Sequence, residues 1–194
     1  MEKFRAILLL GPPGSGKGSI GTILAYLGMG KHLSSGDIFR QLPKGSSLER
    51  GFREQEKKGL LLPDEQAVAI FLKHLNSLVE QQVLHPAKDL LILDGLPRTV
   101  EQVDLIKAQV VVETVVHLKI RDQQTIYDRI EKRARKEGRP DDQISHLARE
   151  RVKEYERKTV EILNRYPPGI LVPVFADLPL PYVCRDLLNK LLSK

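Results

Sequence analysis

The sequence lacks tryptophan and has a single cysteine, Cys184, among its 194 residues. One cysteine cannot form an intrachain disulfide, which fits a reducing compartment. Aromatic residues make up only 5% of the chain, fewer than the stacking surfaces that bind single-stranded nucleic acids usually need. The apolar run near the N-terminus ends at Gly11, so it is too short for a membrane span or the core of a signal peptide. We therefore expect a cytoplasmic protein that does not enter a membrane.

The rest of the composition is that of an ordinary globular protein with a surplus of positive charge. Hydrophobic residues make up 41%, charged residues 29%, and the formal net charge is +6. The length suits one compact domain, residues 1–194, with small insertions. Surplus lysine and arginine can form a solvated surface, or can line a cleft for polyanions such as nucleotides or nucleic acid. Charge alone leaves both interpretations open.

The spacing of apolar residues predicts an α/β fold. Short, nearly unbroken apolar runs are typical of strands buried on both faces, and they occur at 4–10, 90–93, 110–118 and 170–175. Helical spacing separates them, at 17–27, 64–84, 122–135 and 180–192. This alternation predicts a parallel sheet with helices on both faces. The polar segment 34–62 and the charge run 131–142 stand outside the pattern, as lids, binding loops or plain surface loops.

A glycine-rich loop follows the first predicted strand and precedes a predicted helix. It runs from Gly11 to Lys17 and matches G-x-x-x-x-G-K, a motif whose main-chain amides and helix N-terminus hold phosphate groups. The general motif places a hydroxyl directly after the lysine. Here Gly18 takes that place and the hydroxyl follows at Ser19. The alternative is an ordinary turn rich in glycine and proline.

The second predicted strand ends in Asp94. A carboxylate at the end of a buried strand, beside a phosphate loop, suits a magnesium site. Because Mg²⁺ keeps much of its water shell, Asp94 could hold the ion through water. A capping or turn aspartate is the alternative.

Arginines in motifs are candidates to neutralise a row of phosphates, because the guanidinium group stays charged and binds oxygens in pairs. Each one taken singly could also be a surface arginine. Arg129 and Arg133 are four residues apart, so they share one helix face.

Four motifs in this order resemble the adenylate kinase family over nearly the whole chain. Residues 14–19 resemble G-S-G-K-G-T, 32–40 resemble H-L-S-T-G-D-L-L-R, 94–102 resemble D-G-F-P-R-T-x-x-Q, and 138–142 resemble G-R-x-D-D. The resemblance implies a five-stranded parallel sheet of the P-loop NTPase fold, an AMP-binding insertion at 34–62 and a short lid at 132–142. It also implies reversible transfer of the γ-phosphate of ATP to AMP, giving two ADP and serving adenine nucleotide balance.

The resemblance further implies a role for each matching residue. The ATP site would include Gly14, Ser15, Gly16, Lys17, Gly18, Ser19, Arg133 and Pro179. The AMP site would include Ser35, Arg40, Leu60, Leu61, Leu62, Gly95, Leu96, Pro97, Arg98, Gln102, Arg139 and Arg151. The catalytic cations would be Lys17, Arg98, Arg129, Arg133, Arg139 and Arg151.

Cofactor and partner expectations follow from the same resemblance. Magnesium would be bound with ATP, by Asp94 through water and by Ser19. The lid has no cysteine cluster, so we expect no zinc. The family pattern places its last arginine at Glu150. The flanking residues favour Arg151 by a one-residue insertion, and Arg149 is the alternative. A monomer without nucleic acid or membrane partners is expected.

Gln102 carries most of the predicted base preference, because its amide can pair with a donor and an acceptor on adenine. Related UMP/CMP kinases resemble D-G-F-P-R-N-x-x-N here and have alanine at the place of Ser35. Thr99 and Gln102 also match the pattern of a capping box, so the alternative is that Gln102 only caps a helix. The alternative functions are a kinase for CMP or UMP, a catalytically weak nucleotide-binding protein, and a nucleic-acid-binding protein.

Overall fold

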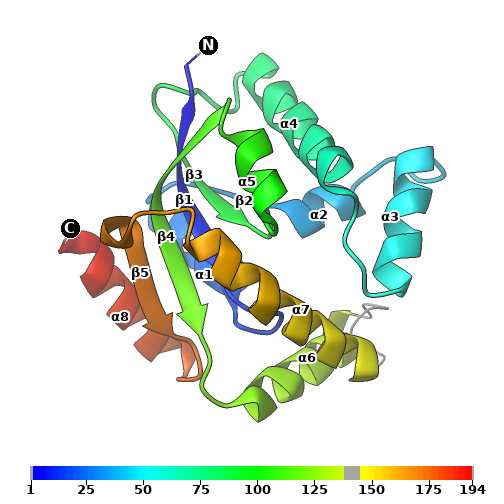
Figure 1. Ribbon diagram of the computed structural model, residues 1–194. Helices are drawn as coiled ribbons and strands as arrows, with labels where there is room; N and C mark the ends of the chain where they lie inside the picture. Colours follow the sequence, from blue (N-terminus) through cyan, green and yellow to red (C-terminus); the bar gives the residue numbers. More distant parts are fainter. Residues whose placement is uncertain (1, 138–144, 194) are drawn as a thin grey trace.

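The computed structural model describes residues 2–137 and 145–193 and confirms the α/β fold (Figure 1). Its sheet has five parallel strands in the order β2-β3-β1-β4-β5. Their bounds are β1 Phe4–Leu10, β2 Lys31–Ser34, β3 Leu90–Asp94, β4 Val110–Lys119 and β5 Leu171–Phe175. In the described part, no helix has the length and apolar character needed to cross a membrane.

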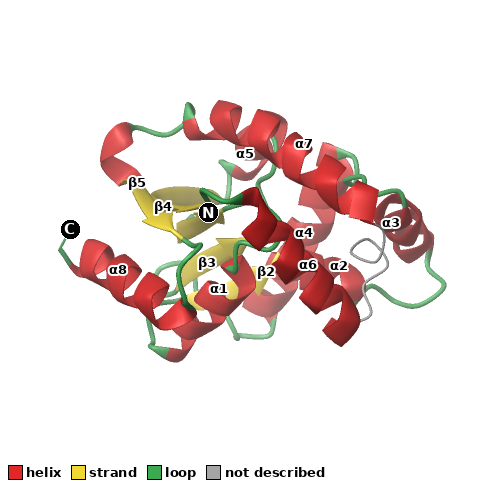
Figure 2. Ribbon diagram, turned by 90° about the horizontal axis from the view of Figure 1, so that it is seen from below, coloured by secondary structure: helices red, strands yellow, loops and turns green. Residues whose placement is uncertain are grey.

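Helices cover both faces of this sheet, as Figure 2 shows. Their bounds are α1 Lys17–Tyr26, α2 Ser35–Arg40, α3 Ser47–Lys57, α4 Asp64–Glu80, α5 Val100–Ile106, α6 Gln123–Glu137, α7 Ser145–Leu163 and α8 Leu180–Leu192, with a 3₁₀ turn at Pro168–Ile170. Alternate residues of β1 enter different cores. Leu8 packs with residues of α4, α5 and α7, whereas Leu9 packs with residues of α1 and α8. Because both faces are buried, the strands read as continuous apolar runs.

The structure differs from the sequence pattern most clearly at strand β2 and at the end of helix α4. The fifth strand, β2, was not visible in the periodicity because only Leu33 among its four residues is buried. Helix α4 ends at Glu80 rather than at residue 84. Its end has a local cause, since Gln82 adopts a φ of 59°, which a continuing α-helix does not allow.

The segment 34–62 contains two helices rather than extended loop. Ser34 caps α2 by accepting a hydrogen bond from the Asp37 N–H at 3.3 Å. Ser46 caps α3 by accepting from the Glu49 N–H at 3.1 Å. Such side chains satisfy amides at a helix start that have no partner within the helix. These helices are short and contain few apolar residues, which is why the sequence pattern did not reveal them.

The strand register brings the carboxyl ends of the central strands together. Asp94 at the end of β3 pairs with Leu9 of β1 on one side and with Ser34 of β2 on the other. The loop that leaves β1 therefore begins beside Asp94. In open parallel sheets, ligands bind in the crevice outside these strand ends, where the crossover direction changes.

Candidate functional site

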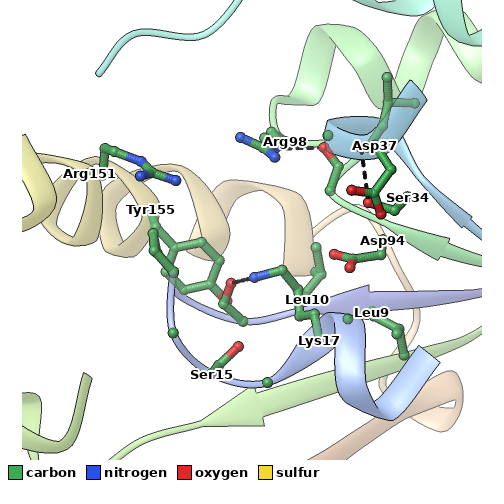
Figure 3. A pocket seen from close by; sticks show the side chains of 18 of the residues that line it. Leu9, Leu10, Ser15, Lys17, Ser34, Asp37, Asp94, Arg98, Arg151 and Tyr155 are labelled. Carbon is green, nitrogen blue, oxygen red and sulfur yellow. Dashed lines mark hydrogen bonds between the residues drawn. The ribbon is translucent and has the colours of Figure 1, made fainter. Parts of the chain in front are cut away.

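A cleft of about 1010 Å³ opens at this edge of the sheet. Its walls come from the loops after β1 and β3, from α2 and α3, and from α6 and α7. In Figure 3, Lys17 and Asp94 lie on the sheet side of this space, and Arg98 and Arg151 extend into it from different elements. The predicted charged groups that the structure describes are thus gathered in one cavity.

The glycine-rich loop wraps around the N-terminus of α1. Gly14 and Gly16 have φ values of 80° and 91°, a left-handed conformation that glycine adopts without strain. A side chain at Gly11 would lie 2.4 Å from the Ser15 Oγ, so glycine is needed there for space. The result is a run of main-chain amides at the positive end of a helix, which suits phosphate oxygens.

Lys17 lies across this loop. Its Nζ donates hydrogen bonds to the carbonyl oxygens of Gly11 at 2.6 Å and Pro12 at 3.1 Å. Burial is the main cause that lowers the pKa of Lys17 to about 8; the charge of Asp94 opposes this shift, and the charges of Arg98, Arg133 and Arg151 contribute to it. So many cations around one cavity are unfavourable unless an anion enters it.

Asp94 is the carboxylate on the floor of the cleft. Burial acts to raise its pKa, but the His32 ring and the charges of Lys17 and Arg98 together outweigh burial and lower the pKa below its ordinary value. The His32 Nε2 lies 3.7 Å from its Oδ2. A side chain at Gly18 would lie 3.7 Å from the same oxygen, so Asp94 faces the start of α1. It is therefore an ionised carboxylate beside the phosphate loop.

Helix α6 places two arginines over the loop. A side chain at Gly14 would lie 3.0 Å from the Ile126 carbonyl oxygen, so loop and helix are in close contact. Arg129 and Arg133, one turn apart on α6, both line the cleft. Arg129 also donates to the Ala176 carbonyl at 2.6 Å, which ties α6 to the segment after β5.

The two candidate arginines, Arg149 and Arg151, lie in different surroundings. Arg151 on α7 lines the cleft. The Arg149 guanidinium carbon instead lies 5.4 Å from the centre of the Tyr127 ring, an arrangement of a cation on an aromatic face. Of these two arginines, Arg151 is the one that lines the cleft, and its role there stays a prediction. The predicted Arg139 lies outside the described residues.

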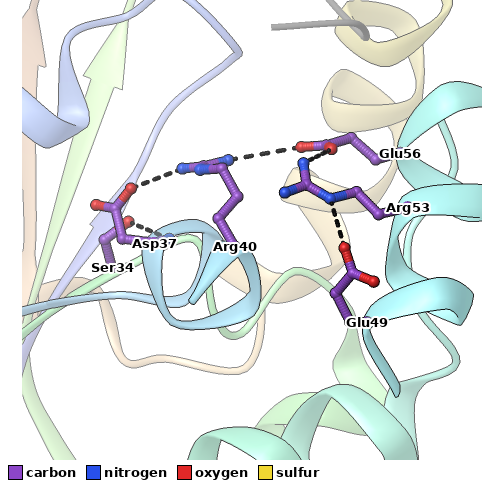
Figure 4. A network of polar contacts seen from close by, with 6 residues as sticks. All are labelled: Ser34, Asp37, Arg40, Glu49, Arg53 and Glu56. Carbon is purple, nitrogen blue, oxygen red and sulfur yellow. Dashed lines mark hydrogen bonds and ion pairs between the residues drawn. The ribbon is translucent and has the colours of Figure 1, made fainter. Parts of the chain in front are cut away.

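The opposite end of the cleft is formed by α2, α3 and the segment before α4. Arg40 of α2 donates to the Asp37 carboxylate at 2.7 Å and lies 3.7 Å from the Glu56 carboxylate of α3 (Figure 4). Phe39, Phe52 and residues 60–62 add apolar lining. This end is suited to a flat apolar group that carries an anion.

The loop after β3 links the two ends. Gly95 has a φ of 82°, and a side chain there would lie 2.7 Å from the Ser35 Oγ and 2.9 Å from Arg98 Nη2. Arg98 itself donates from Nε to the Gly95 carbonyl at 2.6 Å. The Leu96–Pro97 peptide bond is cis, and both residues line the cleft.

Gln102 forms part of the wall and is almost fully buried, at 2% exposure. The Thr99 hydroxyl caps α5 by accepting from the Gln102 N–H at 3.1 Å. The Gln102 side chain makes two further bonds, accepting from the Arg98 N–H and donating to the Asp64 carboxylate, each at 2.7 Å. The capping interpretation of Thr99 is thus correct, and the Gln102 side chain reaches the cleft as well.

Most predicted residues reach the cleft, and two lie beside it. Ser35 is fully buried behind the wall at 0% exposure, and Pro179 lies between Leu178 and Leu180, which do line it. The sequence reasoning missed Asp64 and Glu56. Asp64 looked like the first residue of a helix, and Glu56 looked like one polar residue among many, so no pattern set them apart.

Comparison with known proteins agrees with this geometry. The sequence model of the adenylate kinase family matches residues 9–169. The chain is 34% identical to an adenylate kinase of Encephalitozoon cuniculi, over 84% of each chain. It is 32% identical to one of Synechococcus sp. WH7803, over 88% of this chain and 90% of the relative. It is 30% identical to one of Corynebacterium urealyticum, over 85% and 87%. The phosphate loop and the cations that line the cleft agree with these similarities. The chain therefore belongs to the adenylate kinase family.

Proposed function

We propose that this enzyme transfers the γ-phosphoryl group of ATP to AMP, reversibly and with Mg²⁺, to give two ADP. The observation that carries the proposal is a single cleft with the phosphate loop at one end, Arg40 and Gln102 at the other, and Lys17, Arg98, Arg133 and Arg151 in or beside it. Two nucleotides bound with their phosphates facing each other would bring their negative charges to these cations. We further propose that the enzyme works in the cytoplasm as a monomer of 22.0 kDa.

The chain's own residues would catalyse by position and charge. The acceptor is a phosphate that is already anionic, so the reaction needs no strong base to activate it. Residues 14–19 would hold the ATP phosphates, and Lys17 would contact the group being transferred. Arg98, Arg133 and Arg151 would stabilise charge on the phosphoryl oxygens in an in-line transfer.

The donor set beside the loop fits magnesium. Asp94 has a lowered pKa, and Ser19 also lines the cleft. One carboxylate, one hydroxyl and the phosphates themselves suit an ion that keeps several waters. Bound with ATP, Mg²⁺ neutralises charge on the β- and γ-phosphates and orients them. The sequence gives no reason to expect zinc, because Cys184 is the only cysteine.

The AMP end would be formed by two kinds of contact. Arg40 and Arg98 would bind the α-phosphate, with Arg139 closing from the lid. Gln102 would pair with the adenine, while residues 60–62, Gly95, Leu96 and Pro97 would enclose it and Ser35 would support Gly95 from behind. The segments 34–62 and 132–142 would close over the nucleotides and exclude water, which would otherwise hydrolyse ATP.

A single assay tests the function and its rivals. The purified protein is incubated with Mg-ATP and, in separate reactions, AMP, CMP, UMP or GMP, and the diphosphates are separated and quantified. We expect ADP from AMP at a far higher rate than any other product. Preference for CMP or UMP would assign the chain to a different monophosphate, and no diphosphate from any acceptor would leave only a binding function.

A variant pair ties the activity to the cleft. Lys17→Ala removes the loop cation, and we expect transfer activity to fall about 100- to 1000-fold, with a much smaller effect on stability. Lys107→Ala is the control, because this exposed lysine pairs with Asp104 away from the cleft. Near-normal turnover in Lys17→Ala would refute the role of the loop.

A further inference from the structure

We propose that Asp64 is a positioning residue that fixes the orientation of the Gln102 amide, and that this makes the enzyme select a 6-amino purine over a 6-oxo purine. The inference rests on the proposed function, and it adds a determinant of base choice that no sequence motif indicated. Its basis is the pair of hydrogen bonds on the Gln102 side chain.

The two bonds hold opposite ends of the amide. The Gln102 Nε2 donates to Asp64 Oδ1 at 2.7 Å, and its Oε1 accepts from the Arg98 main-chain N–H at 2.7 Å. A flipped amide would place oxygen against the Asp64 carboxylate and nitrogen against the Arg98 N–H. Both contacts would then be repulsive, so the amide has one favourable orientation.

Burial makes this restraint strong. Gln102 is only 2% exposed, so water cannot replace a lost partner without a free-energy cost. The bond to Asp64 is also charge-assisted, because a carboxylate accepts it, and such bonds are stronger than neutral ones. Asp64 is the first residue of α4 and Gln102 lies in the first turn of α5, so the packing of two helices holds the pair in register.

The fixed amide keeps one donor and one acceptor for a ligand. Nε2 has a second hydrogen and Oε1 has a second lone pair, and the residue lines the cleft. Adenine presents a 6-amino donor beside a ring-nitrogen acceptor, which this pair matches. A 6-oxo purine presents an acceptor at the same place, where the fixed Oε1 also accepts, so it is rejected.

The test compares AMP with inosine monophosphate, which carries a 6-oxo group in place of the 6-amino group. Asp64→Ala removes the restraint at Nε2, and Asp64→Asn keeps a neutral acceptor of nearly the same shape. Glu65→Gln is the matched control, because it removes an exposed carboxylate from the same first turn of α4. For each protein, kcat and KM are measured for both acceptors and for ATP, with the melting temperature as a check of folding.

For Asp64→Ala we expect KM for AMP to rise about tenfold and the AMP-to-inosine-monophosphate ratio of kcat/KM to fall about tenfold, the effect of one lost hydrogen bond. KM for ATP and kcat should stay within about twofold, and Asp64→Asn should be intermediate. Glu65→Gln should match the wild type.

An unchanged ratio in Asp64→Ala, or equal losses for both acceptors, would overturn the inference and leave Asp64 a purely structural role. If Asp64→Ala does not fold, an unchanged ratio in Asp64→Asn would overturn it in the same way. A wild-type protein that forms no ADP from ATP and AMP would instead refute the proposed function.

Discussion

At the scale of single residues, Lys17 is a buried cation whose charge disfavours the folded state. It lies among cations, and burial together with three arginines lowers its pKa to about 8 from the ordinary 10.5. The unfolded chain therefore binds more protons than the folded chain between these values, so the Lys17 contribution to stability rises with pH from about 8 to 10.5. In the proposed function, this cation would contact the phosphates of ATP, which gives a reason for its place in the loop.

The same pKa predicts how activity depends on pH. The ammonium group is present below pH 8 and is lost above it, so kcat/KM for ATP should fall as pH rises through about 8, since this ratio reports the free enzyme. The profile of kcat should fall at higher pH, because bound phosphate stabilises the charged lysine. In Lys17→Arg the residual kcat/KM should stay level from about pH 7 to 9.5, since arginine remains charged.

The measurement is a set of initial rates at varied ATP and saturating AMP in buffers of constant ionic strength. A wild-type kcat/KM that is level through pH 9 would show that Lys17 does not carry this titration.

At the scale of helices, one buried carboxylate adds an ionic link between α2 and α3, beside the edge-to-face ring contact of Phe39 with Phe52. Glu56 is 7% exposed and lies 3.1 Å from Arg53 of its own helix and 3.7 Å from Arg40 of α2 (Figure 4). This contact joins the two helices of the segment 34–62 at the cation that we assign to the AMP phosphate. The position of Arg40 thus depends on a neighbouring helix.

We therefore expect Glu56→Ala to lower the free energy of unfolding by about 1–2 kcal/mol, because two partly exposed arginines lose their shared partner. KM for AMP should rise while KM for ATP stays close to the wild-type value. Urea unfolding and initial rates provide the two readouts.

Glu54→Ala is the control, since this exposed carboxylate pairs with Lys58 at the end of the same helix, and its loss should destabilise the protein clearly less than the loss of Glu56. Equal destabilisation by the two variants would mean that the Glu56 ion pairs contribute nothing beyond an ordinary surface pair.

At the scale of the whole molecule, the two ends of the cleft belong to different parts of the chain that the folded sheet and the helices packed on it bring together. The phosphate loop follows the central strand, while Arg40 belongs to a helix that follows the edge strand β2. A ligand at the AMP end should therefore stabilise the entire fold, because it binds only when these parts are assembled.

AMP at about one hundred times its Kd should raise the free energy of unfolding by about 2.7 kcal/mol. Differential scanning fluorimetry with AMP alone measures this without turnover. In Arg40→Ala the same AMP concentration should have little effect, whereas Arg5→Ala should respond like the wild type, since Arg5 is 64% exposed and pairs with Glu113. An undiminished response in Arg40→Ala would remove Arg40 from the AMP site.

The fold was largely predictable because strands that are buried on both faces appear in the sequence as apolar runs. Four strands were apolar runs, and β1 with its loop formed a motif in the required context. Strand β2 and helices α2 and α3 have no such apolar runs, since their residues are mostly polar and half-buried. In these elements, capping hydrogen bonds and contacts with neighbouring elements determine the structure more than the spacing of apolar residues does.

The residue types and their order along the chain provide the chemistry: a loop that can hold phosphate, a strand-end carboxylate, and arginines in ordered motifs. These are local features, since main-chain conformation and side-chain type depend on neighbours along the chain. Which charges share a space depends on how the helices pack, and this packing puts Arg151 in the cleft and Arg149 on the Tyr127 ring. The pairing of Asp64 with Gln102 is of the same kind, because the packing of α4 against α5 brings residues far apart in the sequence within hydrogen-bond distance.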